Sequence, residues 1–288
     1  MVLGSANADI VVKVNRRPSA GETVLGSDTE ILPGGKGANT AVAAGRLGAD
    51  VALVAAIGDD SYGDLLMSSL RDAGVDTGPV HRVDRATGIA FIMVTPDGEN
   101  SILVSPGANS TLSTTHVEEG LGHPRVVVAS IEVPVATVEH AISLASARGA
   151  RTVLNLSPVA KLSAATLSTL DPLIVNEHEA AWLLGGDAVR PAELLALGPR
   201  SVVITLGARG ALVASSAGVH EIPAPPVDPV DTTGAGDAFT GALAATLATG
   251  ADLVDAARFA VRVAAASVTR RGAQPSYPTA EELAGGGS

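Results

Sequence analysis

The feature that most constrains the fold is a regular alternation of apolar runs and helical segments in the second half of the chain. The apolar runs cover residues 126–130, 152–156, 173–175 and 201–205, and the helical segments lie near residues 135–147, 177–184 and 191–197. Uninterrupted apolar runs are typical of strands covered on both faces, and strand–helix alternation favours parallel pairing. The sequence therefore predicts an α/β fold, with a mostly parallel central sheet and helices on both of its faces.

The first half of the chain adds a strand–helix unit and a group of more polar extended segments. A buried strand over residues 2–5 is followed by a helix at 38–47, an apolar strand at 51–57 and a helix at 59–70. The polar extended segments cover residues 9–14, 23–32, 89–95 and 101–105, and the turn 96–99 joins the last two. We expect these four segments to form a small sheet that projects from the main body.

The length and composition favour a single large domain. The chain has 288 residues, of which 46% are hydrophobic, and this is ample for one full core. We assign residues 1–283 to this domain and expect residues 284–288, which include the final Gly-Gly-Gly-Ser, to be a disordered tail.

The charge pattern and the reactive residue types exclude several classes of function. The net charge is −11 and no basic run is interleaved with aromatics, which argues against nucleic-acid binding. The chain contains no cysteine, and its six histidines lack zinc-site spacing, so thiol and zinc chemistry are not expected. No segment reads as a signal peptide or a membrane span, so we expect a cytoplasmic protein without a membrane partner.

A turn of small residues near the C-terminal end combines an anion site with an acid. Gly234, Ala235 and Gly236 lie where a loop meets the helix predicted at 235–249, so unpaired N–H groups and a positive dipole face an incoming anion. Asp237 falls in the first turn of that helix, where a carboxylate can take a proton from an attacking hydroxyl. An acid that only complements the helix dipole is the alternative interpretation.

Two polar groups in the first forty residues could bind a hydroxyl-rich ligand. Gly35 opens a tight loop in which Lys36 and Asn39 can donate to hydroxyls, although an ordinary turn into a helix gives the same pattern. The loop has neither the P-loop spacing nor the position of a dinucleotide-binding fingerprint. Asn7 and Asp9 alternate along a strand, which aims both side chains to one side, but an Asx turn is equally compatible.

Further polar residues follow the ends of the predicted core strands, where ligands bind in open α/β sheets. Asn176 and Glu179 have the spacing of a capping box, and Glu179 could also lie near a magnesium-bound phosphate through water. The segment from Thr205 to Gly210 and the single acid Glu132 occupy the same edge. A plain turn and an incidental surface acid are the alternatives for these two.

Taken together, these motifs resemble the ribokinase (PfkB) family of carbohydrate kinases over about residues 1 to 280. The first family signature matches residues 34–39 and continues through Gly48 and Gly58, and the second matches residues 231–237 in full. Finer similarities lie in residues 4–9, 21–24, 107–109, 176–179 and 272–276. The resemblance implies a ribokinase-like three-layer sandwich with a small β-sheet lid.

The resemblance also implies phosphoryl transfer from MgATP to the 5-hydroxyl of D-ribose. It makes Asp237 the base and the backbone of Gly234, Ala235 and Gly236 the anion hole. The implied sugar-binding residues, with Asp237, are Asn7, Asp9, Gly35, Lys36, Asn39 and Glu132. The residues implied on the ATP and Mg²⁺ side are Asn176, Glu179, Thr205, Gly207 and Gly210. Those implied to hold K⁺, largely through backbone carbonyls, are Asp231, Thr233, Ser267, Arg270, Gly272 and Ser276.

The family resemblance further implies that the small sheet is a lid over the sugar and that the lids of two subunits pair in a homodimer. Arg16 and Arg17 lie in a predicted lid turn, where they are either exposed or favourable to an anionic substrate.

Five other functions remain open at this point. A nucleoside kinase would stack a base on lid aromatics, of which only Phe91 is present, and a sugar-phosphate kinase would use Arg16, Arg17, Arg82 or Arg85. Other PfkB-family sugar kinases, acting on deoxyribose or fructose, fit the same motifs. A catalytically inactive sugar sensor would not need the intact Asp237 motif, and a dinucleotide-dependent dehydrogenase would need a glycine fingerprint after the first strand.

Overall fold

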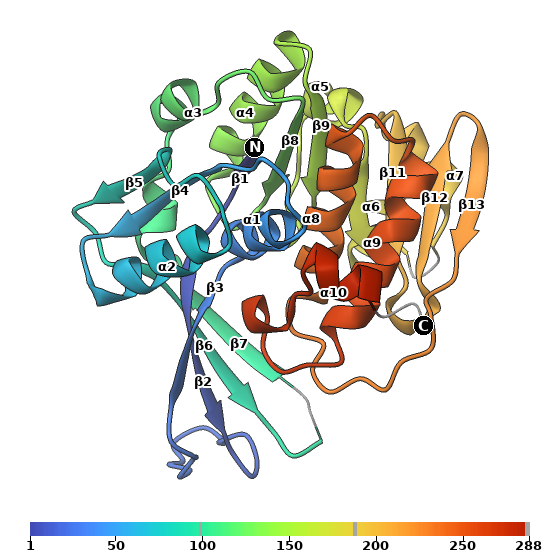
Figure 1. Cartoon of the computed structure of the whole chain (residues 1–288). Helices are drawn as coiled ribbons and strands as arrows, with labels where there is room; N and C mark the ends of the chain where they lie inside the picture. The colour runs from blue at the N-terminus through green and yellow to red at the C-terminus, as the bar shows by residue number, and fades with distance from the viewer. Residues whose placement is uncertain (98–99, 187–188, 286–288) are drawn as a thin grey trace.

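The protein is described by a computed structural model over residues 1–97, 100–186 and 189–285, and these residues form two sheets (Figure 1). The larger sheet has the strand order β13-β12-β11-β10-β9-β8-β1-β4-β5. Its neighbours pair in parallel except at β11–β12 and β12–β13, which are antiparallel. Its strands are β1 (Val2–Leu3), β4 (Leu53–Gly58), β5 (Val80–Val83), β8 (Val126–Ser130), β9 (Arg151–Asn155), β10 (Leu173–Asn176), β11 (Ser201–Thr205), β12 (Ala211–Ser215) and β13 (Gly218–Ile222).

Helices cover both faces of this sheet, because alternate residues of each buried strand point to opposite sides. In β4, Leu53, Ala55 and Ile57 join one apolar core, whereas Val54 and Ala56 join the other. The first core is covered by α1 (Lys36–Arg46), α2 (Ser61–Asp72), α8 (Ala235–Ala248) and α9 (Leu253–Ser267). The second is covered by α3 (Thr114–Gly120), α4 (Val135–Ala147), α5 (Ala164–Thr169), α6 (Glu177–Leu184) and α7 (Pro191–Ala196). The predicted three-layer α/β fold is confirmed.

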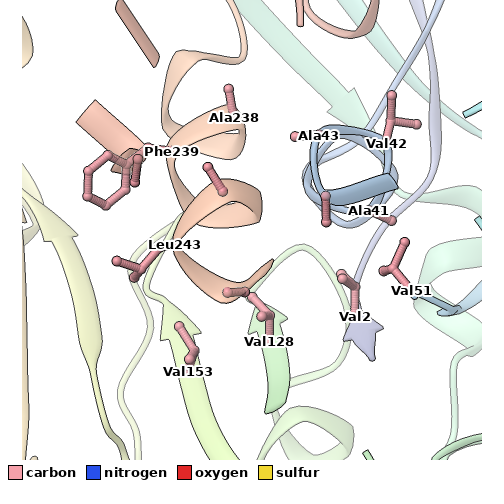
Figure 2. Packing of buried hydrophobic residues seen from close by; sticks show 14 of the residues in the cluster. Val2, Ala41, Val42, Ala43, Val51, Val128, Val153, Ala238, Phe239 and Leu243 are labelled. Carbon is pink, nitrogen blue, oxygen red and sulfur yellow. The ribbon is translucent and has the colours of Figure 1, made fainter. Parts of the chain in front are cut away.

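The first core is built from small and branched aliphatic side chains, and this lets α1 and α8 lie close together. Figure 2 shows Leu243 of α8 next to Val153 and Val128 of the sheet, with Phe239 farther along α8 and Ala43 on the neighbouring helix α1. A Cβ placed on Gly241 of α8 would lie 2.5 Å from the carbonyl oxygen of Thr40 in α1. The two helices therefore touch backbone to backbone, and this contact sets the distance between the residues at their N-terminal ends.

The smaller sheet projects away from the main body, as Figure 1 shows, and has the order β3-β2-β6-β7. Its strands are β2 (Asn7–Lys13), β3 (Glu30–Gly34), β6 (Gly88–Val94) and β7 (Asn100–Ser105). The β2–β6 pair is parallel, and the β2–β3 and β6–β7 pairs are antiparallel. The base of this sheet, at Asn7 and Gly34, is where the chain enters the main body.

Two of the sequence-based boundaries need correction. The strand predicted at 23–32 is wrong over most of its length, because β3 begins at Glu30 and residues 23–29 are almost all exposed, with only a Val14–Gly26 bridge. These residues have no apolar face to bury. The tail predicted at 284–288 begins too early, since α10 (Ala280–Gly285) includes Ala284, and the Thr279 and Glu282 side chains cap the start of this helix.

Other differences concern elements that the sequence did not indicate and segments outside the described residues. The strand β5 and the short helices α3 and α5 have no counterpart in the sequence-based prediction. Residues 98–99 of the predicted turn and residues 286–288 of the predicted tail lie outside the described residues. None of the helices in the described part of the chain combines the length and the apolar character that crossing a bilayer requires.

The α1–α8 contact predicts opposite effects for the same substitution at two positions of α8. Gly241→Ala forces apart two helix backbones and should lower the free energy of unfolding by about 1–3 kcal/mol. Gly236→Ala is the matched control, because its added Cβ meets no atom within 4 Å and alanine favours the helix by up to about 1 kcal/mol. Urea unfolding of both variants measures this, and equal effects at the two positions would contradict the close contact.

Candidate functional site

The predicted site residues gather at the carboxyl edge of the central sheet. Glu132 follows β8, Asn176 ends β10 and Thr205 ends β11. The strands β8 to β11 are parallel, so their carboxyl ends share one edge. The N-terminal ends of α1 and α8 lie close together here, because the two helices pack against each other. Open α/β sheets bind their ligands at such an edge.

Asp237 is a buried carboxylate held by a hydrogen bond from another helix. Its Oδ2 accepts from the Asn39 side-chain amide at 2.9 Å, which joins the first turn of α8 to the first turn of α1. Burial raises the pKa of the Asp237 carboxyl, while the Lys36 ammonium and the Asn39 bond act against that shift. Asp255 holds the same position in α9, three residues after the N-cap, and is exposed there. A helix-dipole acid needs no burial, so Asp237 is placed for more than capping.

Lys36 carries the positive charge of the site and stands among four acids. Burial by itself lowers the pKa of its ammonium, but the negative charges of Asp237, Glu132, Glu179 and Asp9 together raise it above the usual value. The surplus of acids over bases leaves the pocket negative. Such a pocket suits a neutral ligand with several hydroxyl donors better than an anionic one.

Asn7 and Asp9 lie at the base of the small sheet, and both are buried. Asn7 is held by Asn109, whose amide nitrogen donates to Asn7 Oδ1 at 2.7 Å. The Asp9 carboxyl fits only because Gly34 on the neighbouring strand β3 has no side chain, since a Cβ there would lie 2.1 Å from Asp9 Oδ2. Burial, with the charges of Glu132 and Asp237, raises the pKa of Asp9 to about 7.

Glu132 and Gly35 complete this side of the pocket. Glu132 Oε2 accepts from the Ser5 hydroxyl at 2.5 Å and from the Lys36 backbone N–H at 3.4 Å. Gly35 has a φ of 89°, and a Cβ there would lie 2.6 Å from the Asn7 backbone nitrogen. Only glycine can therefore bring the start of α1 against the start of β2. The structure brings all seven predicted sugar-site residues into one cluster, linked by contacts and charge interactions.

The turn at 234–236 has the geometry of an anion site. Gly234 is the N-cap of α8 and has a left-handed backbone with a φ of 73°. The Ala235 N–H donates to the Thr232 carbonyl over a long 3.2 Å, and Gly236 belongs to the first helical turn. N–H groups of a first turn have no acceptor within their helix. The buried Tyr277 hydroxyl donates to the Gly234 carbonyl at 3.0 Å, and this bond holds the turn in place.

A cavity of about 350 Å³ lies directly beside this turn. Its wall includes three of the residues predicted on the nucleotide side, Thr205, Gly207 and Gly210, together with Ala235 and Gly236. The remaining wall is largely apolar and is formed by the segment 224–229 and by α8 and α9. An apolar slot next to an anion site fits a molecule with a flat base at one end and phosphates at the other.

Asn176 and Glu179 form the capping box that their spacing predicts. The Asn176 N–H donates to Glu179 Oε2, and the Glu179 N–H donates to Asn176 Oδ1, both at 2.8 Å. Glu179 is buried and its charge still acts on Lys36, so it faces the same pocket. Within residues 1–97, 100–186 and 189–285, no three His, Asp or Glu side chains gather as a metal cage.

The residues predicted for K⁺ lie on two loops that the structure joins. Asp231 Oδ1 accepts from the Thr233 N–H and hydroxyl at 2.9 and 2.6 Å, and Asp231 Oδ2 accepts from the Gly272 N–H at 2.8 Å. These bonds offset the effect of burial and lower the pKa of Asp231. The Arg270 side chain instead turns outward to Glu282. The Ser276 hydroxyl donates to the Ala273 carbonyl, and the Ser267 hydroxyl to that of Ala264.

Several residues at the pocket were not singled out from the sequence. Gln274 donates to Asn39, Asn109 holds Asn7, and Tyr277 holds Gly234. Gln274 and Asn109 lie inside segments that carry the family resemblance, and that was the available signal. Tyr277 gives no local signal, because its partner lies 43 residues away along the chain.

Comparison with known proteins identifies the family. The pattern of the pfkB family carbohydrate kinases matches residues 1–280. The chain belongs to this family. It is 41% identical to the ribokinase of Bacillus subtilis over 287 residues, which cover 98% of this chain and 97% of that protein.

Solved structures of PfkB-family proteins agree in fold. The ribokinase of Thermotoga maritima has a TM-score of 0.91 and 34% identity, covering 99% of this chain and 97% of that one. The ribokinase of Arabidopsis thaliana, solved with ribose and ATP, has a TM-score of 0.89 and 30% identity, covering 99% and 96% of the two chains. The family membership and this full-length similarity establish an ATP-dependent carbohydrate kinase.

The raised pKa of Asp9 predicts a pH-dependent stability of the ligand-free PfkB-family protein. A folded-state pKa of about 7, above the ordinary 3.8, means that the stability present at low pH is lost as the pH rises toward 7. Asp9→Asn cannot ionise, so its unfolding free energy relative to the parent should rise by up to about 4 kcal/mol between pH 4 and pH 8. Urea unfolding across this range measures the difference, and a difference that stays constant would contradict the shift.

Proposed function

We propose that this protein transfers the γ-phosphoryl group of ATP to the 5-hydroxyl of D-ribose. The observation that carries the proposal is the position of Asp237, a buried carboxylate next to the anion turn of α8 and facing a pocket rich in hydroxyl-binding groups. The choice of D-ribose as the substrate rests on the similarity to ribokinases, one of which was solved with ribose and ATP.

The mechanism follows from this arrangement. The Asp237 carboxylate takes the proton of the 5-hydroxyl while that oxygen forms a bond to the γ-phosphorus, and the bond from the γ-phosphorus to ADP breaks. The backbone N–H groups of Gly234, Ala235 and Gly236 stabilise the charge that develops on the transferred group, with the long Ala235–Thr232 bond giving way to the phosphate. The burial that raises the pKa of Asp237 makes it a better proton acceptor at neutral pH.

The remaining pocket residues bind and orient the two substrates in this proposal. Asn7, Asp9, Gly35, Lys36, Asn39 and Glu132 surround the sugar hydroxyls, and Asp9 and Glu132 accept hydrogen bonds from them. The slot beside Thr205, Gly207 and Gly210 takes the adenine and ribose of ATP. In this proposal the phosphates lie at the turn and the γ-phosphoryl group faces Asp237.

Two cations fit the residues present. The acids among the described residues do not form a cage, so Mg²⁺ would be held mainly by ATP phosphates and water, with Asn176 and Glu179 as the protein groups on its side of the site. The loops joined by the Asp231–Gly272 bond offer one carboxylate and the backbone carbonyls of Thr233, Ser267, Arg270, Gly272 and Ser276, an all-oxygen set suited to K⁺. Mg²⁺ would neutralise phosphate charge, and K⁺ would order the turn that Asp231 precedes.

We also propose that the small sheet is a lid and that two lids pair in a homodimer. Ile31, Phe91 and Leu103 lie in register across β3, β6 and β7 and leave apolar side chains exposed on one face of this sheet. An exposed apolar sheet face of this kind is typical of a protein–protein contact. The cytoplasmic location expected from the sequence stays a prediction.

The charges of the lid favour a neutral sugar over a sugar phosphate. Arg16 forms a bidentate ion pair with Glu22 at the exposed end of the lid. Arg82 pairs with Asp59 and Asp64. These two arginines are therefore engaged by acids of the same chain. Phe91 is the single aromatic on the described lid strands, which gives a nucleoside base little to stack on.

Replacement of the base tests the mechanism. Asp237→Asn should lower turnover of D-ribose by about 100- to 10,000-fold and leave the dissociation constant of ribose within a few-fold, because only the proton acceptor is lost. Asp255→Asn is the matched control at the same helical position of α9, and it should keep full activity. Calorimetric ribose titration and ADP release measure both, and near-normal turnover of Asp237→Asn would disprove the mechanism.

A substrate panel tests the specificity. ADP release is measured with D-ribose, 2-deoxyribose, fructose, adenosine and a hexose phosphate, each in potassium and in sodium buffer. D-ribose with potassium should give the highest kcat/KM. Preference for another compound would keep the Asp237 chemistry and reassign the sugar pocket, and ribose binding without any turnover would favour an inactive sensor.

The dimer has its own test on the lid. Leu103→Lys places a charge at a residue that is 69% exposed on β7, and it should shift sedimentation from dimer to monomer. Val219→Lys on β13 is the matched control, since Val219 is 54% exposed but lies on the far edge of the large sheet. A monomeric parent protein, or a dimer untouched by Leu103→Lys, would rule out this interface.

A further inference from the structure

Four polar side chains from separate parts of the chain form a single line of hydrogen bonds that ends on Asp237. The Ser69 hydroxyl donates to Gln274 Oε1 at 2.6 Å, and the Gln274 amide nitrogen donates to Asn39 Oδ1 at 3.0 Å. The Asn39 amide nitrogen then donates to Asp237 Oδ2 at 2.9 Å. Gln274, Asn39 and Asp237 are all buried, so water cannot readily replace one of these bonds.

The hydrogen bonds in this line can run from donor to acceptor in only one direction, which the groups at its two ends determine. Asp237 as a carboxylate can only accept, so Asn39 must present its nitrogen to it and its oxygen to Gln274. Gln274 must in turn present its nitrogen to Asn39 and its oxygen to Ser69, whose hydroxyl can donate. Each amide is therefore fixed by the neighbour behind it, and networks of this kind strengthen their members.

We propose that Gln274 is a positioning residue for the phosphoryl-transfer reaction, which orients the Asn39 amide so that its nitrogen always faces Asp237, with Ser69 fixing Gln274 from behind. The inference rests on the proposed role of Asp237 as the base. Neither Gln274 nor Ser69 bonds to Asp237 directly, so both act through Asn39.

Gln274 lies in a short segment whose other residues form hydrogen bonds to neighbouring loops. Gly272 donates to Asp231, Gln274 to Asn39, and the Tyr277 hydroxyl to Gly234. One six-residue segment after α9 thus holds the loop proposed for K⁺, the base and the anion turn at once. A change in the conformation of this segment therefore alters the surroundings of Asp237 through Gln274, while the groups proposed to touch a substrate stay the same.

The orientation of Asn39 matters because the charged groups around Asp237 have opposing effects on its carboxylate. Lys36 on α1 stabilises the carboxylate, whereas Glu132 after β8 and Asp9 on β2 disfavour it. Tyr277 of the C-terminal segment also lies within electrostatic range of Asp237. If the Asn39 amide turned over, its oxygen would face the carboxylate and Asp237 would hold its proton to a higher pH.

The deciding experiment compares Gln274→Glu and Ser69→Ala with the parent protein. A glutamate at this position can only accept when ionised, so it would draw the Asn39 nitrogen away from Asp237. We expect the acidic limb of the kcat/KM profile to move up by about one pH unit, with about a tenfold loss below that limb and partial recovery above it. Ser69→Ala should move the limb in the same direction by less, and Ser68→Ala, its exposed neighbour on α2, should not move it.

A second measurement separates this inference from the proposed function. Carboxyl carbon NMR of the substrate-free protein, with the Asp237 signal assigned from Asp237→Asn, follows the titration of Asp237 without any turnover. An upward shift in both Gln274→Glu and Ser69→Ala supports the positioning role even if D-ribose is not the substrate. If Gln274→Glu does not fold, Ser69→Ala decides alone. An unchanged Asp237 titration in the folded variants overturns the inference.

Discussion

The backbone contact between α1 and α8 is the constraint on which the rest of the structure depends. Gly241 lets α8 approach the Thr40 carbonyl of α1 more closely than a residue with a Cβ would allow, and Asn39 lies within hydrogen-bond distance of Asp237 at the start of these helices. A larger residue at Gly241 would push the N-terminal ends of α1 and α8 apart. The proposed chemistry tolerates no such displacement, because a proton transfer needs its partners at hydrogen-bond distance.

Electrostatics links the acids of the site to one cation. The negative charges of Asp237, Glu132, Glu179 and Asp9 all act on Lys36 and favour its charged form. The acids are brought there by the parallel strands, whose carboxyl ends share an edge, and by the small sheet, whose base delivers Asp9. The fold therefore concentrates negative charge, and the ligand that suits the result is one rich in hydroxyl donors.

Sequence reasoning predicted the architecture that the structure shows, and its errors in strands and short helices have two causes. The central strands and α8 could be predicted because apolar periodicity is a local signal, and the glycine turns because only glycine permits their backbone. The strand expected at 23–32 is wrong because extended-looking polar residues do not pair unless a partner covers them, and residues 23–29 are almost all exposed. The strand β5 and the short helix α5 were missed because they are held by neighbours distant in sequence.

The sequence by itself determined the family and the parallel sheet, because the family signatures are local motifs and the core strands recur as apolar runs between helical segments. It also named the residues that are proposed to carry the chemistry. Only the tertiary structure decided how those residues act on one another. The line from Ser69 through Gln274 to Asn39 joins segments up to 235 residues apart, and the Tyr277–Gly234 bond has no local counterpart. A hydrogen bond between distant segments leaves no periodicity in the chain, since its energy depends on geometry that exists only after folding.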